Sequence, residues 1–310
     1  MGILNQSDVI FMQTPVAFLV FNRPDTTQQV FNAIRQAKPP KLLVVADGPR
    51  GTHPDDAAKC AAVRAIIDTI DWDCEVLTNY ADTNLGCKNR VSSGLDWVFE
   101  QVEEAIILED DCLPEQSFFP FCEELLERYR HNEQIMAISG DNFQFGRKRT
   151  DYSYYFSIYN HCWGWGTWRR AWQHYDVDMR QWPKINKRKF LQNLFSNVFA
   201  AKYWQNKFTQ TYEGKINTWD YQWTFTCWQN NALTVLPEVN LVKNIGFGNA
   251  STHTNNQFNP YANLETSPIA FPLKHPTEMV QCQIADHFTQ NHKFGFWPRA
   301  YRKLQGLIQQ

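Results

Sequence analysis

An apolar run that ends in three consecutive carboxylates is the feature that most constrains this chain. Residues 105–108 are Ala-Ile-Ile-Leu, and Glu109, Asp110 and Asp111 follow directly. An uninterrupted apolar run of this length is typical of a strand buried on both faces of a sheet. Its acidic end then lies at the carboxyl edge, where open α/β folds bind ligands. Three adjacent anions repel one another, so the run indicates a site for Mg²⁺ or Mn²⁺, with a solvated acidic turn as the alternative.

Strands and amphipathic helices alternate along the first half of the chain. The apolar patterns predict strands at 16–21, 42–46, 75–77, 105–108 and 135–139, with helices at 24–37, 55–70, 91–102 and 118–129. This alternation predicts an α/β fold with a mostly parallel, Rossmann-like central sheet flanked by helices. The second half is rich in aromatic residues and its periodicity is weaker. There we expect helices at 166–173, 187–208 and 221–229, a strand at 233–236 and a long polar loop at 244–267.

Charge and cysteine usage narrow the functional classes. The 310 residues include 30 basic and 32 acidic side chains, which argues against a nucleic-acid-binding surface. The eight cysteines show no C-x-x-C spacing, and this favours reduced thiols in a cytoplasmic protein. We find neither a signal-peptide pattern at the N-terminus nor an apolar stretch long enough to span a membrane.

Three predicted strands end in residues suited to a nucleotide. The first is followed by Phe21, Asn22 and Arg23, the second by Asp47, and the fourth by the acidic run. A nucleotide laid across this edge needs a base contact, a ribose acceptor and a metal that holds its phosphates, and these positions supply them in that order. The chain contains no G-x-x-x-x-G-K-[ST] motif, so it is not a P-loop protein.

Five segments together resemble a known enzyme family. They are Asn-Leu-Gly-Cys-Lys-Asn-Arg at 84–90, Leu-Glu-Asp-Asp at 108–111, Gly-Trp at 164–165, Trp-Asp-Tyr-Gln-Trp at 219–223, and the run of Pro-Glu, Gly-Phe-Gly and His at 237–253. In this order the chain resembles GT-A glycosyltransferases of the β-1,2-N-acetylglucosaminyltransferase I type. Two residues, Tyr221 and Gln222, depart from the W-D-D-W segment of that family, which leaves the acceptor open.

The resemblance assigns roles to individual residues. It implies that Asp111 is the direct metal ligand, with His253 as a further metal or phosphate contact. Asp110 is expected at the ribose or at metal-bound water, and Glu109 at the donor sugar. Asp220 becomes the general base, a role worth about 10²–10⁴-fold in rate. As an alternative, Asp220 caps the helix that follows it.

Two further residues at the expected site have both a functional and a structural interpretation. Arg90 is expected near the phosphates of the nucleotide-sugar, because its guanidinium offers a fork of N–H groups. The alternative is a charged side chain on the surface of a helix. Trp219 is expected beside the nucleotide-sugar, and burial in the core explains it equally well. His253 likewise is either a ligand or a solvated histidine in a polar loop.

The implied activity is that of a metal-dependent, inverting hexosyl- or N-acetylhexosaminyl-transferase. The resemblance favours a UDP-sugar donor and a glycan or lipid-linked acceptor. A nucleotidyltransferase and a catalytically silent carbohydrate-binding protein are the alternatives. The first lacks its usual glycine-rich loop after strand one, and the second is disfavoured by the intact Asp111 and Asp220.

We expect the organisation to follow these roles. Residues 1–150 form a nucleotide-sugar-binding half, and residues 151–275 form an acceptor and catalytic half of the same domain. Residues 276–310 form a tail with helical character, whose aromatic and basic run at 294–304 suits either contact with an anionic membrane or packing on the domain.

Overall fold

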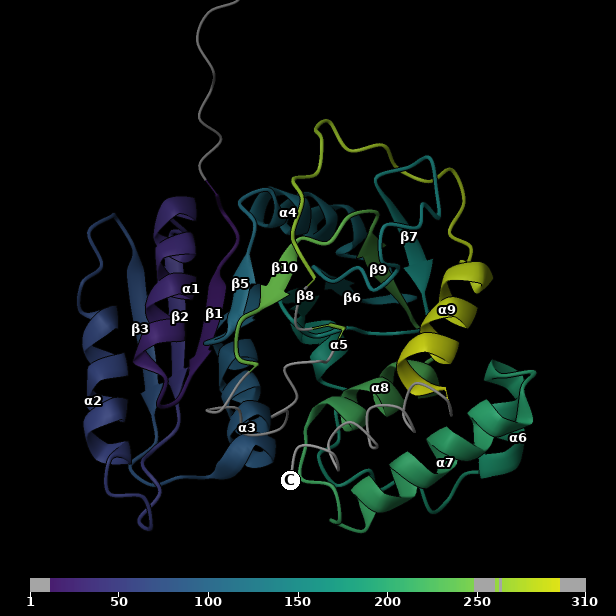
Figure 1. Cartoon of the computed structure of the whole chain (residues 1–310), viewed down its shortest axis with the longest axis horizontal. Coiled ribbons are helices and arrows are strands. Elements are labelled where there is room, and N and C mark those ends of the chain that lie inside the picture. Colours follow the sequence, from purple (N-terminus) through teal and green to yellow (C-terminus); the bar gives the residue numbers. More distant parts are fainter. Residues whose placement is uncertain (1–11, 248–259, 262–263, 296–310) are drawn as a thin grey trace, which may run out of the picture.

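The first half forms the expected alternation of strands and helices (Figure 1). The computed structural model describes residues 12–247, 260–261 and 264–295. The elements are β1 (Val16–Val20), α1 (Pro24–Ala37), β2 (Lys41–Ala46), α2 (Asp56–Ile67), β3 (Glu75–Tyr80), α3 (Gly86–Gln101) and β4 (Glu104–Glu109). Strands β1 to β4 are parallel neighbours in the order β3-β2-β1-β4.

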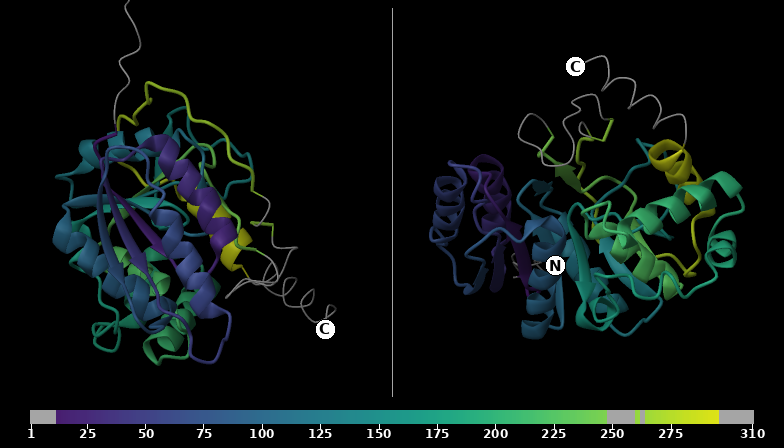
Figure 2. Two further views of the ribbon diagram at one scale, coloured as in Figure 1. Left: turned by 90° about the vertical axis from the view of Figure 1, so that its left-hand side faces the viewer. Right: turned by 90° about the horizontal axis from the view of Figure 1, so that it is seen from below.

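The order of the strands reverses between β1 and β4, and this reversal positions the site. The chain steps outward from β1 to β3 and then returns through α3 to the other side of β1. Crossovers between parallel strands are right-handed, so the reversal places α3 on the opposite face from α1 and α2 (Figure 2). A crevice opens outside the carboxyl ends of the strands at such a switch point. The Phe21 and Asp110 positions flank it.

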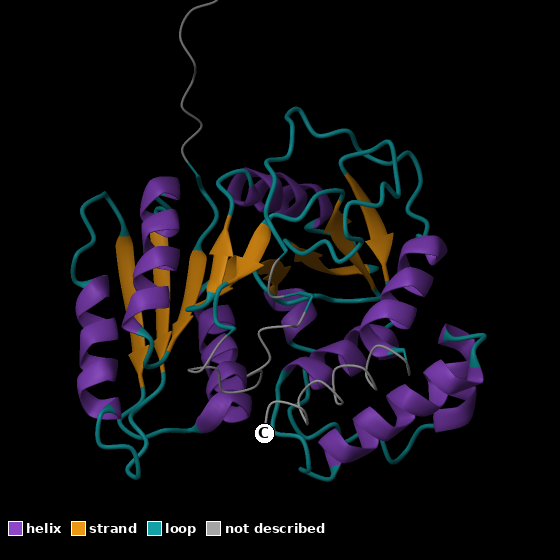
Figure 3. Cartoon of the chain, viewed as in Figure 1, coloured by secondary structure: helices purple, strands orange, loops and turns teal. Residues whose placement is uncertain are grey.

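The second half extends the same sheet with strands of both directions (Figure 3). Its elements are β5 (Cys112–Pro114), α4 (Phe118–Tyr129), β6 (Ile135–Ser139), β7 (Tyr154–Ser157), β8 (Trp165–Trp168), α5 (Arg169–Trp172), α6 (Lys187–Leu194), α7 (Val198–Tyr212), α8 (Asp220–Gln229), β9 (Leu233–Pro237), β10 (Val242–Asn244) and α9 (Gln283–Thr289), which continues as a π-helix at Gln290–Phe294. The eight-stranded order is β3-β2-β1-β4-β8-β6-β9-β7, and β10 pairs with β5 separately. Only β7 and β8 run against the other six strands of the large sheet.

The expected helix at 166–173 is wrong for its first half. Residues Trp165–Trp168 form β8, which pairs antiparallel with β4 on one side and β6 on the other, and helix α5 begins only at Arg169. Both Trp165 and Trp168 are buried. The pairing comes from strands about 30 to 60 positions away, so a local helical pattern does not reveal it.

The expected helix at 187–208 is two helices. The chain leaves α6 at Phe195 with an extended backbone and enters α7 through Asn197. The Asn197 side chain accepts from the backbone N–H groups of Phe199 and Ala200. An asparagine N-cap of this kind starts a new helix, because it satisfies donors that lack a partner inside the helix.

One large hydrophobic core runs through both halves, and the last helix packs through Ala285 on a separate, smaller cluster with Tyr155 and Leu236. Asp286 of α9 accepts hydrogen bonds from the Ser157 hydroxyl, the Ile158 backbone N–H and the Gln281 amide.

All eight cysteines lie in the described residues and are free thiols. Among the helices the structure describes, none combines the length and apolar character needed to cross a bilayer.

Candidate active site

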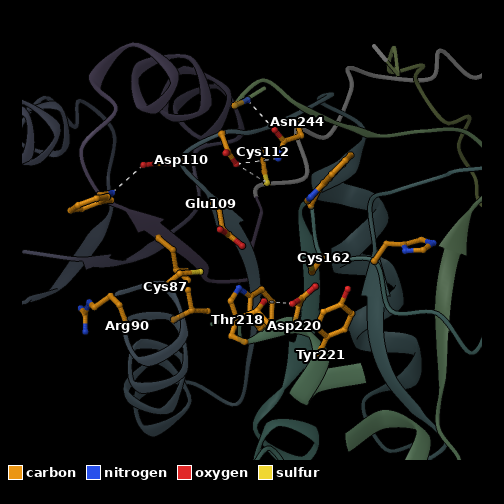
Figure 4. Close-up of a pocket in the computed structure, with 18 of the residues that line it drawn as sticks. Cys87, Arg90, Glu109, Asp110, Cys112, Cys162, Thr218, Asp220, Tyr221 and Asn244 are labelled. Atoms are coloured by element: carbon orange, nitrogen blue, oxygen red, sulfur yellow. Dashed lines mark hydrogen bonds between the residues drawn. The ribbon is translucent and has the colours of Figure 1, made fainter. Parts of the chain in front are cut away.

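A cavity of about 590 Å³ lies at the switch point and takes its walls from both halves of the chain. The ends of β1, β2 and β4 form one wall, and the start of α8 faces them across the cavity (Figure 4). Of the sequence-predicted residues, this cavity brings together Phe21, Arg23, Asp47, Arg90, Glu109, Asp110, Asp111, Trp219 and Asp220. Asn22 is outside this lining, and His253 lies outside the described residues.

The acidic end of β4 closes the switch point. Asp110 is buried, and its Oδ2 accepts the backbone N–H of Phe21 at 3.0 Å, which joins the ends of β4 and β1. Burial, followed by the neighbouring Asp111 and Asp110 charges, raises the pKa of Glu109 to about 8. Burial and the Asp111 charge also raise the pKa of Asp110. Full ionisation of the cluster is therefore unfavourable, and a bound cation would stabilise the charged carboxylates.

Asp111 already has a cation beside it. Its Oδ2 lies 2.7 Å from Nη1 of Arg23, and its Oδ1 accepts from the Asn244 amide at 3.3 Å. Asn244 is delivered by the antiparallel pairing of β10 with β5, in which it lies opposite Cys112. The backbone also passes close by, because a Cβ added to Gly246 would lie 2.1 Å from Asp111 Oδ2.

The metal-ligating groups around Asp111 suit a divalent ion that is coordinated by phosphates as well as by the protein. Within the described residues, no group of three or more His, Cys, Asp or Glu side chains is arranged to hold a metal. Mg²⁺ and similar ions are commonly held by one or two carboxylates, with the remaining positions filled by substrate phosphates and water. The residues present therefore fit a metal that binds together with a nucleoside diphosphate, rather than a metal held in an all-protein cage.

Asp47 organises the turn that leads into α3. Its Oδ1 accepts the backbone N–H groups of Gly48 and Leu85, and its Oδ2 accepts from the Gly86 N–H and the Asn84 amide. Gly86 has a φ of 76°, a conformation that favours glycine. Asp47 was expected to contact a ribose. Both of its carboxylate oxygens instead accept hydrogen bonds from the 84–86 turn, which forms part of the cavity wall.

Two expected nucleotide contacts are engaged elsewhere in the protein. The Asn22 amide donates to Asp56 Oδ1 at 2.8 Å. Arg90 is 6% exposed, and its guanidinium donates to the Ala46 carbonyl and to both oxygens of Asn79. Arg90 therefore ties α3 to the ends of β2 and β3.

Phe21 has a cationic neighbour that the sequence did not point to. The Arg50 guanidinium lies 5.4 Å from the Phe21 ring centroid and forms an ion pair with Asp56 at 2.6 Å. This pair holds the pKa of Asp56 well below its usual range, chiefly through the hydrogen bond from Arg50. Phe21 and Arg50 both line the cavity and together offer an aromatic and cationic surface there.

The opposite wall is formed by the start of α8. Asp220 is the first residue of that helix and accepts a hydrogen bond from the Thr218 hydroxyl (Figure 4). It is not the N-cap residue, which is Trp219. Trp219 stacks on Trp165 with ring centroids 5.7 Å apart, and both are buried. Trp165 lies in the core behind the cavity, whereas Trp219 contributes to its lining.

The sequence did not identify several polar residues of the cavity. They are Arg50, Asp141, Asn160, His161, Thr218, Asn244 and Lys293. Asp141 had a usable signal, because it follows the end of β6 closely, as Asp47 follows β2. His161 and Lys293 lie in segments without a periodic pattern, so only the folded chain reveals them. Burial lowers the pKa of His161, and its imidazole is uncharged at neutral pH.

Comparison with known proteins gives partial structural similarities only. No protein-family model and no curated protein matches the chain. The mannosyltransferase PcManGT from Pyrobaculum calidifontis, in complex with GDP-Man and Mn²⁺, is 13% identical, with 55% of this chain and 49% of that one covered at a TM-score of 0.38. This chain thus spans about half the length of that mannosyltransferase.

Two other solved structures are similar over a comparable extent. A 4-diphosphocytidyl-2C-methyl-D-erythritol synthase from Anaerococcus prevotii is 8% identical, with 56% and 78% of the two chains covered and a TM-score of 0.33. Mouse xyloside xylosyltransferase 1 in its apo form is 13% identical, with 69% and 81% covered and a TM-score of 0.32.

Proposed function

We propose that this chain is a metal-dependent, inverting glycosyltransferase that uses a nucleoside-diphosphate sugar. The observation that carries the proposal is the placement of a pair of carboxylates and a single third one on opposite walls of one cavity. Asp110 and Asp111 lie at the β1/β4 switch point, and Asp220 lies across from them at the start of α8. The pair suits a nucleotide with its cation, and Asp220, which is separate from it, suits proton transfer.

The donor would lie along the strand ends. Phe21 and Arg50 form a surface for the base, with Asp110 at the ribose end, and Arg23 supplies a positive charge for the phosphates. Asp47 holds the adjacent 84–86 turn in place. Asp111 would hold Mn²⁺ or Mg²⁺, with His253 as the further ligand implied by the resemblance. The bound ion would stabilise the negative charge that develops on the leaving nucleoside diphosphate. Glu109 then faces the donor sugar.

Asp220 would act as the general base. In an inverting transfer, the acceptor oxygen attacks C1 of the donor sugar from the face opposite the leaving group and loses its proton to a carboxylate. The Thr218 hydroxyl donates to Asp220 Oδ1 and so orients the carboxylate. The neighbouring Trp219 is held by Trp165, which fixes the beginning of α8.

We further propose a UDP-linked hexose or N-acetylhexosamine as donor and a glycan or lipid-linked hydroxyl as acceptor. These finer assignments rest on the resemblance at 108–111 and 219–223. A nucleotidyltransferase would use the same edge of the sheet but would release pyrophosphate. Release of a nucleoside diphosphate therefore separates the two reactions.

Asp111→Asn tests the metal and donor site. We expect the variant to lose Mn²⁺-dependent binding of UDP or GDP in calorimetry, since an amide keeps the size of the side chain but lacks its charge. Asp151→Asn is the matched control, because Asp151 is 94% exposed and does not line the cavity. Unchanged metal-dependent affinity in Asp111→Asn would overturn the proposal.

A further inference from the structure

A second group of polar side chains lies in the cavity, apart from the carboxylates of β4 and α8. Within the described residues, Asp141 Oδ1, His161 Nε2 and both polar atoms of the Asn160 amide are buried without a hydrogen-bond partner. Asp141 is 0% exposed and His161 is 5% exposed. All three residues line the cavity. Buried polar atoms without partners are rare in folded proteins, and a group of them in one cavity points to a ligand that supplies the partners.

These side chains are held in position by the fold. Asp141 Oδ2 accepts the Trp163 backbone N–H at 3.0 Å, which leaves Oδ1 as its unpartnered atom. The His161 ring lies 4.3 Å from the Phe143 ring and is parallel to Tyr159 within 4°. Such packing fixes the imidazole, so its unpartnered Nε2 keeps a defined position.

Aromatic rings form the rest of this recess. Trp163 packs edge-on against Phe143 at 5.2 Å and against Phe247 at 5.6 Å. The Lys293 ammonium lies 4.1 Å from the Phe143 ring centroid. Lys293 lies in the π-helix at Gln290–Phe294, a form of helix that often occurs at functional sites.

The chemistry of the recess favours an uncharged ligand rich in hydroxyl groups. A hydroxyl both donates and accepts, so it can pair with a carboxyl oxygen, an imidazole nitrogen and either end of an amide. A carboxylate group only accepts hydrogen bonds, so it suits the unpartnered Asp141 Oδ1 less well than a hydroxyl group does. Aromatic rings suit the apolar C–H face of a sugar.

We propose that Asp141, Asn160 and His161 form the subsite for the acceptor, and that the acceptor presents an uncharged pyranose ring there. The hydroxyl groups of this ring bond to the three polar side chains, and its apolar face packs on Trp163. This inference rests on the proposed function, which supplies the donor on the opposite wall. It adds the class of acceptor sugar and the residues that select it.

Asn160→Ala tests the subsite, because the amide of Asn160 has no partner within the described protein that the change would remove. The probes are methyl glycosides of glucose, galactose, mannose and N-acetylglucosamine, with methyl glucuronide as the anionic analogue of the glucoside. Their binding is titrated by saturation-transfer NMR, both without nucleotide and with UDP or GDP plus Mn²⁺ to occupy the donor side. Asn206→Ala, an exposed change on α7, is the matched control.

We expect at least one uncharged glycoside to bind and to bind more tightly than the glucuronide. The loss of a hydrogen bond should weaken its binding roughly fivefold in Asn160→Ala and leave it unchanged in Asn206→Ala. Tighter binding of the glucuronide, equal affinities in the wild type and Asn160→Ala, or no saturable signal from any uncharged glycoside would each overturn the subsite. Failure of the proposed function is distinct, because it appears as an absence of nucleotide binding in the presence of Mn²⁺.

Discussion

At the scale of single residues, Asp220 gives the sharpest test of the chemistry. Asp220→Asn keeps the shape of the side chain and an oxygen that can accept from Thr218, but an amide cannot take a proton. We expect sugar transfer to fall by at least about 10²-fold, while nucleotide binding and the melting temperature stay near wild-type values.

A structural role for Asp220 predicts a different result. Asp220 is the first residue of α8, where its charge interacts favourably with the helix dipole, so a purely structural carboxylate would lose about 0.3–1 kcal/mol of stability and little rate on this change. The transfer rate and the melting temperature are therefore measured on the same preparation. Near-normal turnover would remove Asp220 as the base and reopen the choice between inverting and retaining chemistry.

At the scale of elements, the contact of α3 with β2 depends on a glycine inside the helix. A Cβ added to Gly94 would lie 2.4 Å from Val45 Cγ1, and Val45 is buried in the sheet and unable to move aside. We expect Gly94→Ala to destabilise the fold by about 1–3 kcal/mol in urea denaturation, in spite of the better helix propensity of alanine.

Gly51→Ala provides the comparison for this prediction. No heavy atom lies within 4 Å of a Cβ added there, so we expect a change within about 0.5 kcal/mol. Equal stability of the two variants would show that α3 can shift on β2. The 84–86 turn at the start of α3, and with it one wall of the cavity, would then be less firmly held than the structure indicates.

The attachment of α9 predicts a pH effect on stability. Burial raises the pKa of Asp286 from 3.8 to about 6, although hydrogen bonds from Ser157 and Gln281 oppose the shift. Between about pH 4 and 6 the folded state therefore holds a proton that the unfolded state has lost, so the stabilisation from protonated Asp286 falls as the pH rises. The loss is of the order of 2–3 kcal/mol at 1.36 kcal/mol per pKa unit.

Asp286→Asn isolates this contribution. We expect the free energy of unfolding of the variant to decline less than that of the wild type between pH 4 and 6. Chemical denaturation at matched pH values measures both curves. Parallel curves would mean that Asp286 titrates with its unfolded-state pKa despite its burial.

At the scale of the whole molecule, the cavity joins both halves of the chain, so its ligand should stabilise the fold as a unit. A ligand that binds only the native state adds about 2.7 kcal/mol at 100 times its Kd. For a chain of this size we expect a nucleoside diphosphate with Mn²⁺ to raise the melting temperature by several degrees.

Metal removal is the control for that rise. With EDTA, the nucleotide alone should give a smaller shift, because Asp110 and Asp111 then repel its phosphates. A shift of equal size with and without the metal would argue that the phosphates are bound by Arg23 and its neighbours alone.

Much of the fold could be predicted from the sequence, because short segments carry the pattern of burial that defines each strand or helix. Apolar runs such as 16–20 and 105–108 report burial on both faces, and the periodic pattern at 118–129 reports one buried helix face. The polar residue after each such strand falls at the carboxyl edge of the sheet. The sequence alone therefore predicts Asp47, Asp110 and Asp111 at that edge. Asp220 followed from the resemblance at 219–223 and lines the same cavity.

The partners of these residues depended on the tertiary structure. Asn22 bonds to Asp56, and Arg90 bonds to the ends of β2 and β3, although both were expected to face a nucleotide. The strand β8 arises from pairing with β4 and β6, against its local pattern. A hydrogen-bonding group takes whichever partner the packing brings within 3 Å, and that partner is encoded far away in the sequence.

The sequence by itself determined the α/β alternation and the acidic edge, because burial and strand direction are properties of short segments. Only the tertiary structure decided the switch point between β1 and β4, since strand order depends on the path of the whole chain. It also decided that Asp141, His161 and Lys293, which span more than 150 positions, share one recess. Such a meeting follows from packing several elements at once, and no local pattern records it.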